Sequence, residues 1–224
     1  MCFMIKSSLV LLCFMFLFGC KKNHQTVLTV YNDGYQGYNA AGLVTKESNV
    51  LNQKPGLVIL MIGSNDVYNP AELPQYNSNV LQIINAVRKT GSKVLIMTPP
   101  EMDTILRKVA NEKLDSLSIV IKNISVQNQC YFFDVHKLFK NNKYETNQLL
   151  FSDGLHPDSA GYKLISDSLF YYMQKQNLTT IKIISCFGDS ITFGKSVKGE
   201  GTSTGDTYPA LLKILLAAQT GNLD

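Results

Sequence analysis

The sequence predicts a three-layer α/β domain built on a five-stranded parallel sheet. Short apolar runs of strand length alternate with longer segments whose apolar residues recur every three or four positions, a pattern typical of parallel strands joined by crossover helices. A chain of 224 residues, of which 45% are hydrophobic and 17% charged, fits one compact domain with a sizeable core. We therefore expect a single domain in place of several.

The elements are expected in strict alternation along the chain. Five runs have the length and apolar character of strands: Val27–Tyr31, Leu57–Ile62, Lys93–Met97, Cys130–Phe133 and Ile181–Phe187. Four segments have helical spacing: Asn77–Lys89, Asp103–Gln127, Ser159–Gln176 and Tyr208–Ala218. Gly91 is a natural stop after the first helix. Asp206 or Thr207 is expected to cap the last helix, with Pro209 in its first turn.

The first residues have the pattern of a processing signal. Lys6 gives a short basic start, and the apolar run that follows it is too short to span a bilayer as an ordinary helix. The run ends in Leu-Phe-Gly-Cys, which resembles a bacterial lipobox, although Phe18 is bulkier than that pattern usually has. We expect a signal peptide over residues 1–19, lipidation of Cys20, a tether over 20–26 and a domain over 27–224. The alternatives are an uncleaved anchor or simple secretion.

The charge and the cysteine content exclude several classes of function. The formal net charge of +4 is modest and the basic residues are scattered, so the sequence has no nucleic-acid footprint. If Cys20 carries lipid, only Cys130 and Cys186 remain in the mature chain, each inside an apolar run. No CxxC pair or His/Cys cluster has the spacing of metal ligands. We expect a membrane-anchored extracytoplasmic protein, periplasmic or on the outer membrane, that needs no metal or cofactor.

Polar and glycine-rich clusters follow the predicted strands. Gly188-Asp189-Ser190 comes after the last strand, Gly63-Ser64-Asn65-Asp66 after the second, and Gly37 lies just beyond the first. Asp153-Gly154-Leu155-His156 precedes the helix that starts at Ser159. Ligands of open parallel sheets bind beyond the carboxyl ends of the strands, so these clusters are expected to meet at one edge of the sheet.

These blocks resemble the GDSL/SGNH hydrolase family, whose second name records a Ser, a Gly, an Asn and a His in separate blocks. Ser190, Gly37, Asn65 and His156 match those positions. The family normally starts with the GDS strand and ends with the DxxH helix, whereas here the DxxH helix leads straight into the GDS strand. The resemblance therefore implies a circularly permuted chain with a flavodoxin-like sheet. Such a change can leave a fold intact when the termini lie close together.

The residues can be combined into a serine esterase. A serine hydroxyl needs a base to take its proton, and His156 is the histidine beside a carboxylate at the active end. Asp153, three residues earlier, would fix the tautomer of His156 and stabilise the imidazolium. As the family pattern implies, the backbone N–H groups of Ser190 and Gly37 and the side-chain amide of Asn65 would form the oxyanion hole.

The expected substrates are carboxylic esters of small molecules or glycans. Lipid anchoring favours acetyl esters of carbohydrates, while lysophospholipase and thioesterase activities remain alternatives within the family. A lipid-anchored binding protein that kept the fold and lost turnover is the alternative from another class, and ligand binding without turnover would favour it. The glycine-rich stretch Gly194–Gly205 is expected to be flexible and to border the pocket.

Several other polar residues are expected to be structural. Asp189 and Asp66 should cap or brace loops, and Asp134 and His136 should belong to a surface turn without a catalytic role. A disulfide between the two mature cysteines is not expected, because in a flavodoxin-like order their strands lie about 14 Å apart and a bridge needs Cα atoms within about 7 Å. Both thiols should be free and buried.

Overall fold

The computed structural model describes residues 27–68, 73–142, 146–151 and 153–219. The predicted signal peptide, Cys20 and the tether lie outside the described residues. Five strands form one sheet in the order β1-β5-β2-β3-β4, and every neighbouring pair is parallel. They are β1 (Thr29–Gly34), β2 (Leu57–Met61), β3 (Lys93–Met97), β4 (Tyr131–Phe133) and β5 (Ile183–Gly188). The predicted five-stranded parallel sheet is confirmed.

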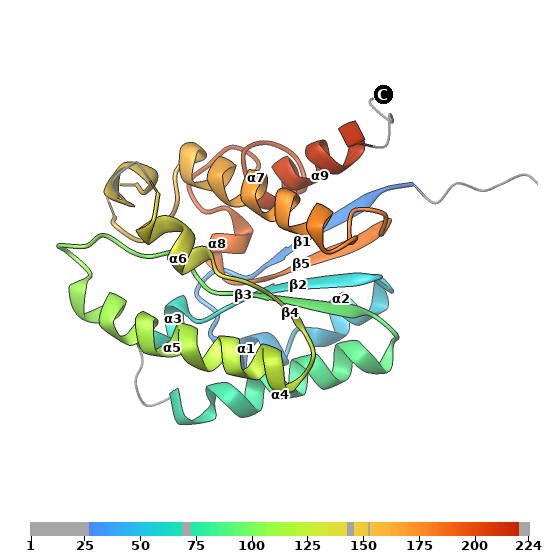
Figure 1. Cartoon of the computed structure of the whole chain (residues 1–224), viewed down its shortest axis with the longest axis horizontal. Coiled ribbons are helices and arrows are strands. Elements are labelled where there is room, and N and C mark those ends of the chain that lie inside the picture. Colours follow the sequence, from blue (N-terminus) through green and yellow to red (C-terminus); the bar gives the residue numbers. More distant parts are fainter. Residues whose placement is uncertain (1–26, 69–72, 143–145, 152, 220–224) are drawn as a thin grey trace, which may run out of the picture.

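Helices cover both faces of the sheet (Figure 1). On one face, α1 (Ala40–Val44), α2 (Glu47–Asn52), α4 (Leu73–Lys89) and α5 (Lys108–Gln127) enclose a buried apolar cluster with β2 and β3. The other face is packed by α6 (Val135–Lys140), α7 (Ser159–Lys175) and α9 (Tyr208–Gln219). Short elements lie between them: α3 (Ser64–Tyr68), α8 (Ser190–Phe193) and the 3-10 turn η1 (Thr146–Leu149).

The register of the sheet aligns the strand ends that carry the polar blocks. Gly188 at the end of β5 pairs with Gly34 at the end of β1 and with Met61 at the end of β2. The residues that follow these three strands therefore emerge side by side at one edge of the sheet. Since β5 lies between β1 and β2, Ser190 is central in this set.

The long elements match their predicted ranges within a few residues, and the differences have local causes. Asn32, Asp33 and Gly34, expected just beyond the first strand, belong to β1 because they continue its pairing with β5. The helix expected from Asp103 begins at Lys108, because the Asp103 side chain accepts hydrogen bonds from Ile105 N (2.8 Å) and Leu106 N (2.6 Å) in a separate turn. The short helices α1, α2, α3, α6 and α8 were not predicted.

The two described cysteines are free and lie on separate strands. Cys186 is buried in β5, whereas Cys130, just before β4, is only partly buried, so the expectation that both are buried was wrong for Cys130. Two strands, β2 and β3, separate β5 from β4, in agreement with the predicted absence of a disulfide. Within the part of the chain that the structure describes, no helix is both long and apolar enough to cross a membrane.

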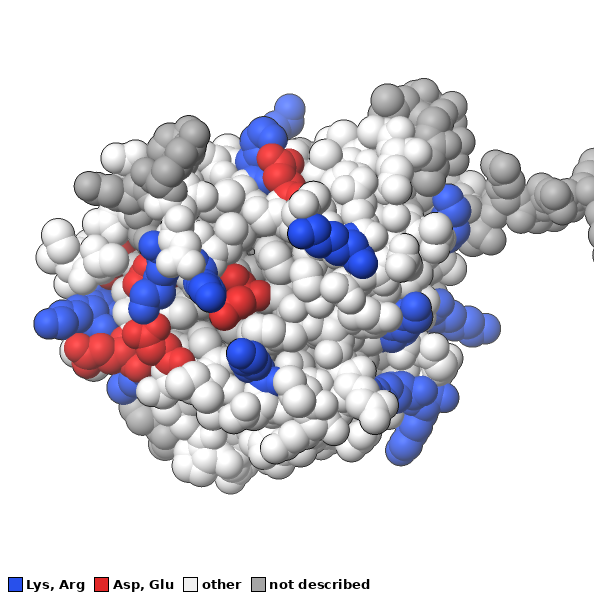
Figure 2. Space-filling view, viewed as in Figure 1, with Lys and Arg blue, Asp and Glu red and all other residues white. Residues whose placement is uncertain are grey.

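Basic side chains do not gather into a continuous patch on the face shown in Figure 2. Lys and Arg side chains are separated by uncharged surface, and acidic side chains lie among those at the left of the view. This distribution agrees with the scattered basic residues of the sequence and gives no extended anion-binding face on this side.

Candidate active site

Ser190 stands at a tight strand-to-helix turn between β5 and α8. Asp189 is extended and its carboxylate accepts a hydrogen bond from Ile191 N (2.9 Å), which caps α8 and makes Ser190 its first residue. A Cβ atom on Gly188 would lie 2.2 Å from Thr192 Oγ1 and 2.4 Å from the Met61 carbonyl oxygen. Only glycine allows α8 and β2 to pack this closely around the turn.

His156 links Ser190 to Asp153 by two short contacts. The Nε2 atom of His156 lies 2.9 Å from Ser190 Oγ, and its Nδ1 atom lies 2.6 Å from Asp153 Oδ2. The histidine is 4% exposed and Ser190 6% exposed, whereas 41% of the Asp153 side chain is exposed. When Nδ1 donates its proton to Asp153, Nε2 is free to accept the serine hydroxyl. The structure thus brings together the three residues expected to carry the chemistry.

The turn that carries Asp153 fixes the position of its carboxylate and lowers its pKa. The second carboxylate oxygen, Oδ1, accepts hydrogen bonds from Leu155 N (2.9 Å) and His156 N (3.1 Å). Partial burial would raise the pKa of Asp153, but the hydrogen bonds from His156 and Leu155 outweigh it and the pKa is lowered. Asp153 is therefore charged at neutral pH and suited to orient the imidazole.

Gly37 and Asn65 lie at the same edge and are connected to each other. The side-chain amide of Asn65, on α3, donates to the Tyr38 carbonyl (2.8 Å), which leaves its second N–H available. Gly37 has a φ of +76°, which favours glycine, and among the described residues its N–H has no hydrogen-bond partner. A Cβ atom on Gly37 would meet nothing within 4 Å, so the backbone conformation and not a close protein contact explains the glycine here.

Two buried carboxylates brace this edge, as expected for Asp66 and Asp189. Asp66 accepts hydrogen bonds from Ala40 N (3.1 and 3.3 Å) and so holds the segment that follows Gly37. Complete burial raises the pKa of Asp189 to about 7, with a further increase from the nearby charge of Asp66. Its Oδ2 atom and the nearby Ser64 hydroxyl form no hydrogen bond of normal geometry, although the hydroxyl lies close enough to favour the charged form.

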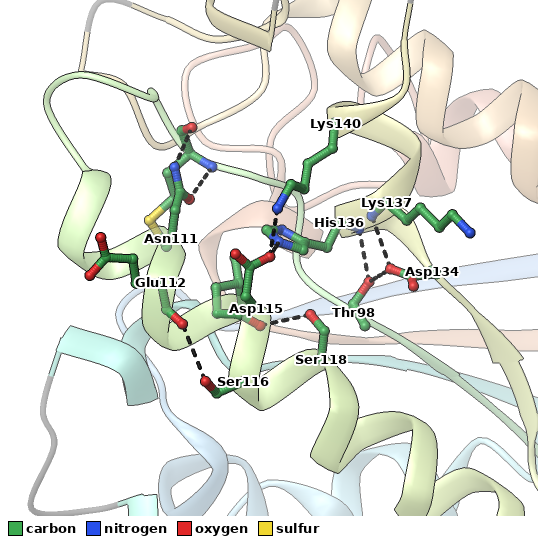
Figure 3. A network of polar contacts seen from close by, with 12 residues as sticks. Thr98, Asn111, Glu112, Asp115, Ser116, Ser118, Asp134, His136, Lys137 and Lys140 are labelled. Atoms are coloured by element: carbon green, nitrogen blue, oxygen red, sulfur yellow. Dashed lines mark hydrogen bonds and ion pairs between the residues drawn. The ribbon is translucent and has the colours of Figure 1, made fainter.

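His136 belongs to a separate network (Figure 3). Its side chain is 4% exposed and its Nε2 atom lies 2.7 Å from Asp115 Oδ1, which also accepts a hydrogen bond from Lys140 (2.7 Å). Asp134 caps α6 through Lys137 N (3.0 Å). The expectation of a surface turn was therefore wrong for the buried His136, whose network joins α6 to α5.

The glycine-rich stretch 194–205 begins beside the nucleophile. Lys195 N donates to the Ser190 carbonyl (3.1 Å), and the segment then folds against β1, where Asn32 Nδ2 donates to the Thr202 carbonyl (3.0 Å). Among the described residues, no group of three or more His, Cys, Asp or Glu side chains is placed to hold a metal ion. The chemistry available at this edge is that of the serine, the imidazole, the carboxylate and amide donors.

Comparisons with known proteins point to one family. The model of the GDSL-like Lipase/Acylhydrolase family matches residues 20–164, more than half of the chain. The matched range contains Gly37, Asn65, Asp153 and His156 and ends before β5 and Ser190. A search of characterised proteins finds an acetylxylan esterase of Geobacillus stearothermophilus that is 25% identical over 155 residues, which are 62% of this chain and 69% of that protein.

Solved structures share the fold. The acetylxylan esterase of Geobacillus stearothermophilus superimposes with a TM-score of 0.51 at 22% identity, over 60% of this chain and 67% of that one. A lipase/acylhydrolase from Enterococcus faecalis superimposes with a TM-score of 0.54 at 23% identity, over 62% of this chain and 72% of that one. From the family match and these relatives, the chain belongs to the GDSL-like lipase/acylhydrolase family and is an ester-hydrolysing enzyme.

Proposed function

We propose that this enzyme hydrolyses carboxylic esters through a covalent acyl-Ser190 intermediate. The observation that carries the proposal is the unbroken chain of contacts from Ser190 Oγ to His156 and from His156 to Asp153, at 2.9 and 2.6 Å. These distances are those over which a base takes a proton from a nucleophile and a carboxylate orients the base. The position of Ser190 directly after β5, with the loop before α7 bringing His156 and Asp153 to it, supports the same conclusion.

The steps follow from the groups present. His156 Nε2 takes the hydroxyl proton as Ser190 Oγ attacks the ester carbonyl carbon, and a tetrahedral intermediate with a negative oxygen forms. The C–O bond to the alcohol then breaks, and the alcohol leaves with the proton that His156 returns. Water, deprotonated by His156, attacks the acyl-serine, and the acid departs as Ser190 recovers its proton. Asp153 stabilises the imidazolium in both halves of the cycle.

Three donors are proposed for the oxyanion. The Ser190 N–H lies in the first turn of α8, where backbone N–H groups lack partners within the helix. The Gly37 N–H and the second N–H of Asn65 are available in the described chain. Asn65 holds the Tyr38 carbonyl, so the amide donor and the Gly37 turn are fixed relative to each other. Donors fixed before the reaction need no reorganisation as charge develops.

Acetyl esters of carbohydrates are the proposed substrates. The acetylxylan esterase relative supports this class, although at 25% identity over part of each chain. Lysophospholipase or thioesterase activity is the alternative within the family, and a binding protein with weak turnover is the alternative outside it. The intact set of Ser190, His156, Asp153, Gly37 and Asn65 favours catalysis, since binding alone has no need of all five.

The test is release of p-nitrophenol from p-nitrophenyl acetate by the chain without residues 1–20. We expect Ser190→Ala and His156→Asn to abolish the enzymatic rate, and Asn65→Ala to lower kcat by roughly 100- to 1000-fold. His136→Asn is the matched control, because His136 is also buried and paired with an Asp but does not contact Ser190. A folded wild type no faster than Ser190→Ala would reject the serine mechanism. Release of acetate from acetylated xylan, compared with lysophospholipid and thioester cleavage, then identifies the substrate class.

We also propose that residues 27–224 form one circularly permuted domain. The family match ends at residue 164, before the strand that carries the GDS block, and β5 is last in the chain yet second in the sheet. A sheet in which the Ser190 strand came first in the chain would have the order 2-1-3-4-5 of flavodoxin-like folds. The sheet order and the limits of the match both support a permuted order within an ordinary family fold.

We propose that Cys20 is lipidated and that the enzyme is an extracytoplasmic lipoprotein of a bacterial membrane. The Leu-Phe-Gly-Cys sequence after a short apolar run supports this. The described chain starts beside the amino end of β1, at the end of the sheet opposite Ser190. Cys20→Ser should abolish incorporation of labelled palmitate, and unchanged labelling would reject the assignment.

A further inference from the structure

Arg107 contacts two parts of the candidate site, the helix α3 that carries Asn65 and the turn that carries Asp153 and His156. Its guanidinium carbon is 5.4 Å from the centre of the Tyr68 ring, on the same helix α3 that carries Asn65. Its Nη2 atom donates a hydrogen bond to the Asp153 carbonyl (3.0 Å). We propose that Arg107 is a positioning residue that holds the Asp153–His156 turn in place against α3. This inference rests on the proposed serine mechanism.

The segment that presents Arg107 is itself fixed. The Asn111 side chain, in the first turn of α5, accepts a hydrogen bond from Met102 N (2.9 Å) and donates one to the Met102 carbonyl (3.0 Å). Asp103 Oδ1 then closes the following turn through Ile105 N and Leu106 N. The backbone that carries Arg107 is therefore held in place by these hydrogen bonds, and its guanidinium can hold its own partners in place.

The same segment contacts two successive carbonyls of the catalytic turn. Asp103 N donates to the Gly154 carbonyl (2.8 Å), next to the Asp153 carbonyl that Arg107 contacts. The turn's own bonds, from Gly154 N to the Phe151 carbonyl and from Phe151 N to the His156 carbonyl, are internal. Internal bonds keep the shape of the turn but do not place it relative to α3, whereas the contacts of Arg107 with Tyr68 and with the Asp153 carbonyl connect the two.

The guanidinium has the geometry that this position requires. Its central carbon lies 5.4 Å from the centre of the Tyr68 ring while one of its N–H groups donates to the Asp153 carbonyl, and a lysine ammonium has no planar group that can make both contacts in this way. Arg107 contacts the backbone of Asp153, whose carboxylate is already occupied by His156 and by backbone N–H groups. Its role is therefore to set the position of the Asp153–His156 pair. Small displacements of such pairs lower rates strongly.

The experiment compares Arg107→Ala and Arg107→Lys with Arg88→Ala in the chain without residues 1–20, using p-nitrophenyl acetate. Arg88 is a matched control because its guanidinium also donates to a backbone carbonyl, that of Asn128, far from Ser190 in the sequence and the sheet. We expect Arg107→Ala to lower kcat by roughly 10- to 100-fold with little change in KM, as for a misplaced catalytic group. Arg107→Lys should restore only part of the loss, and Arg88→Ala should match the wild type.

The pH profile separates positioning from a general loss of stability. A less well held Asp153 stabilises the imidazolium less, so the acidic limb of kcat/KM should move to lower pH in Arg107→Ala. Tyr68→Ala should give a smaller loss, and adding it to Arg107→Ala should cause little further loss, since both remove one linkage. Urea unfolding of each variant confirms that the assays measure folded protein.

The outcomes distinguish this inference from the serine mechanism. If the rate depends on Ser190 but Arg107→Ala has the wild-type kcat and pH profile, the positioning role is rejected and the mechanism stands. A reduced kcat with an unmoved acidic limb also rejects it, since a fold effect alone gives that result. If the rate does not depend on Ser190, the mechanism fails and this inference fails with it.

Discussion

Asp189 is a buried carboxylate held next to the nucleophile by a single strong cap. It is 1% exposed, and burial raises the pKa of its carboxyl to about 7, well above the usual value of 3.8. The cap bond from Ile191 N favours the charged form, whereas the charge of Asp66 disfavours it. Because the pKa of Asp189 is higher in the folded protein than in the unfolded chain, protonation of its carboxyl stabilises the fold. This contribution to the unfolding free energy is fully present below about pH 4 and is lost as pH rises through about 7.

Replacing Asp189 by Asn tests this linkage. An Asn side chain can still accept from Ile191 N, so the cap is kept while the ionisation is removed. We expect the unfolding free energy of Asp189→Asn, relative to the wild type, to be higher at pH 8 than at pH 5 by about 2 to 3 kcal/mol, because roughly two of the three pKa units of the shift lie between pH 5 and pH 7. Urea unfolding at both pH values measures it. Asp158→Asn, at the cap of α7, controls for replacing a capping carboxylate. Equal differences at pH 5 and pH 8 would contradict the prediction.

At the scale of elements, the shortest helices place the chemistry. The five-residue α3 carries Asn65 and Asp66, and the four-residue α8 starts with Ser190. Periodicity requires several helical turns, so it identified the cores of α4, α5, α7 and α9 but not these short helices. The polar blocks GSND and GDS nevertheless marked the right positions, because each follows a strand whose end is fixed by the sheet.

Contacts between distant elements could not be predicted from the sequence. Arg107 meets an Asp153 carbonyl 46 residues away, and His136 meets Asp115 21 residues away. No motif marks either pair, since their proximity depends on how α5 packs against its neighbours. The His156–Asp153 pair was predictable because the two are three positions apart along the chain, and its approach to Ser190 followed only once β5 was placed between β1 and β2.

At the scale of the whole molecule, the sheet order matters more than the chain order. The polar groups come from turns after β1, β2 and β5 and from the loop before α7, and the register brings the three strand ends together. None of these relations depends on which strand the ribosome makes first. The α9 helix and the start of β1 lie on the same side of the molecule in Figure 1, and both pack into one apolar cluster. This arrangement allows the chain order to be changed experimentally.

A chain permuted so that β5 comes first and α7 last, the usual order of the family, should fold and remain active. It would be opened between Gln176 and Asn177, which are both exposed, and Gln219 would be joined to Val27 through a series of glycine–serine linkers. Leu178 is buried and should stay covalently attached to β5. We expect cooperative unfolding and a kcat/KM of the same order as that of the parent chain, because every strand pairing and the Ser190–His156 contact are retained.

A control opened between Leu95 and Ile96, inside β3, should not fold, since it interrupts the pairing with β2 and β4. Loss of folding at every linker length in the first design would mean that the link between α7 and β5 is required, and the permuted domain proposed here would then be rejected.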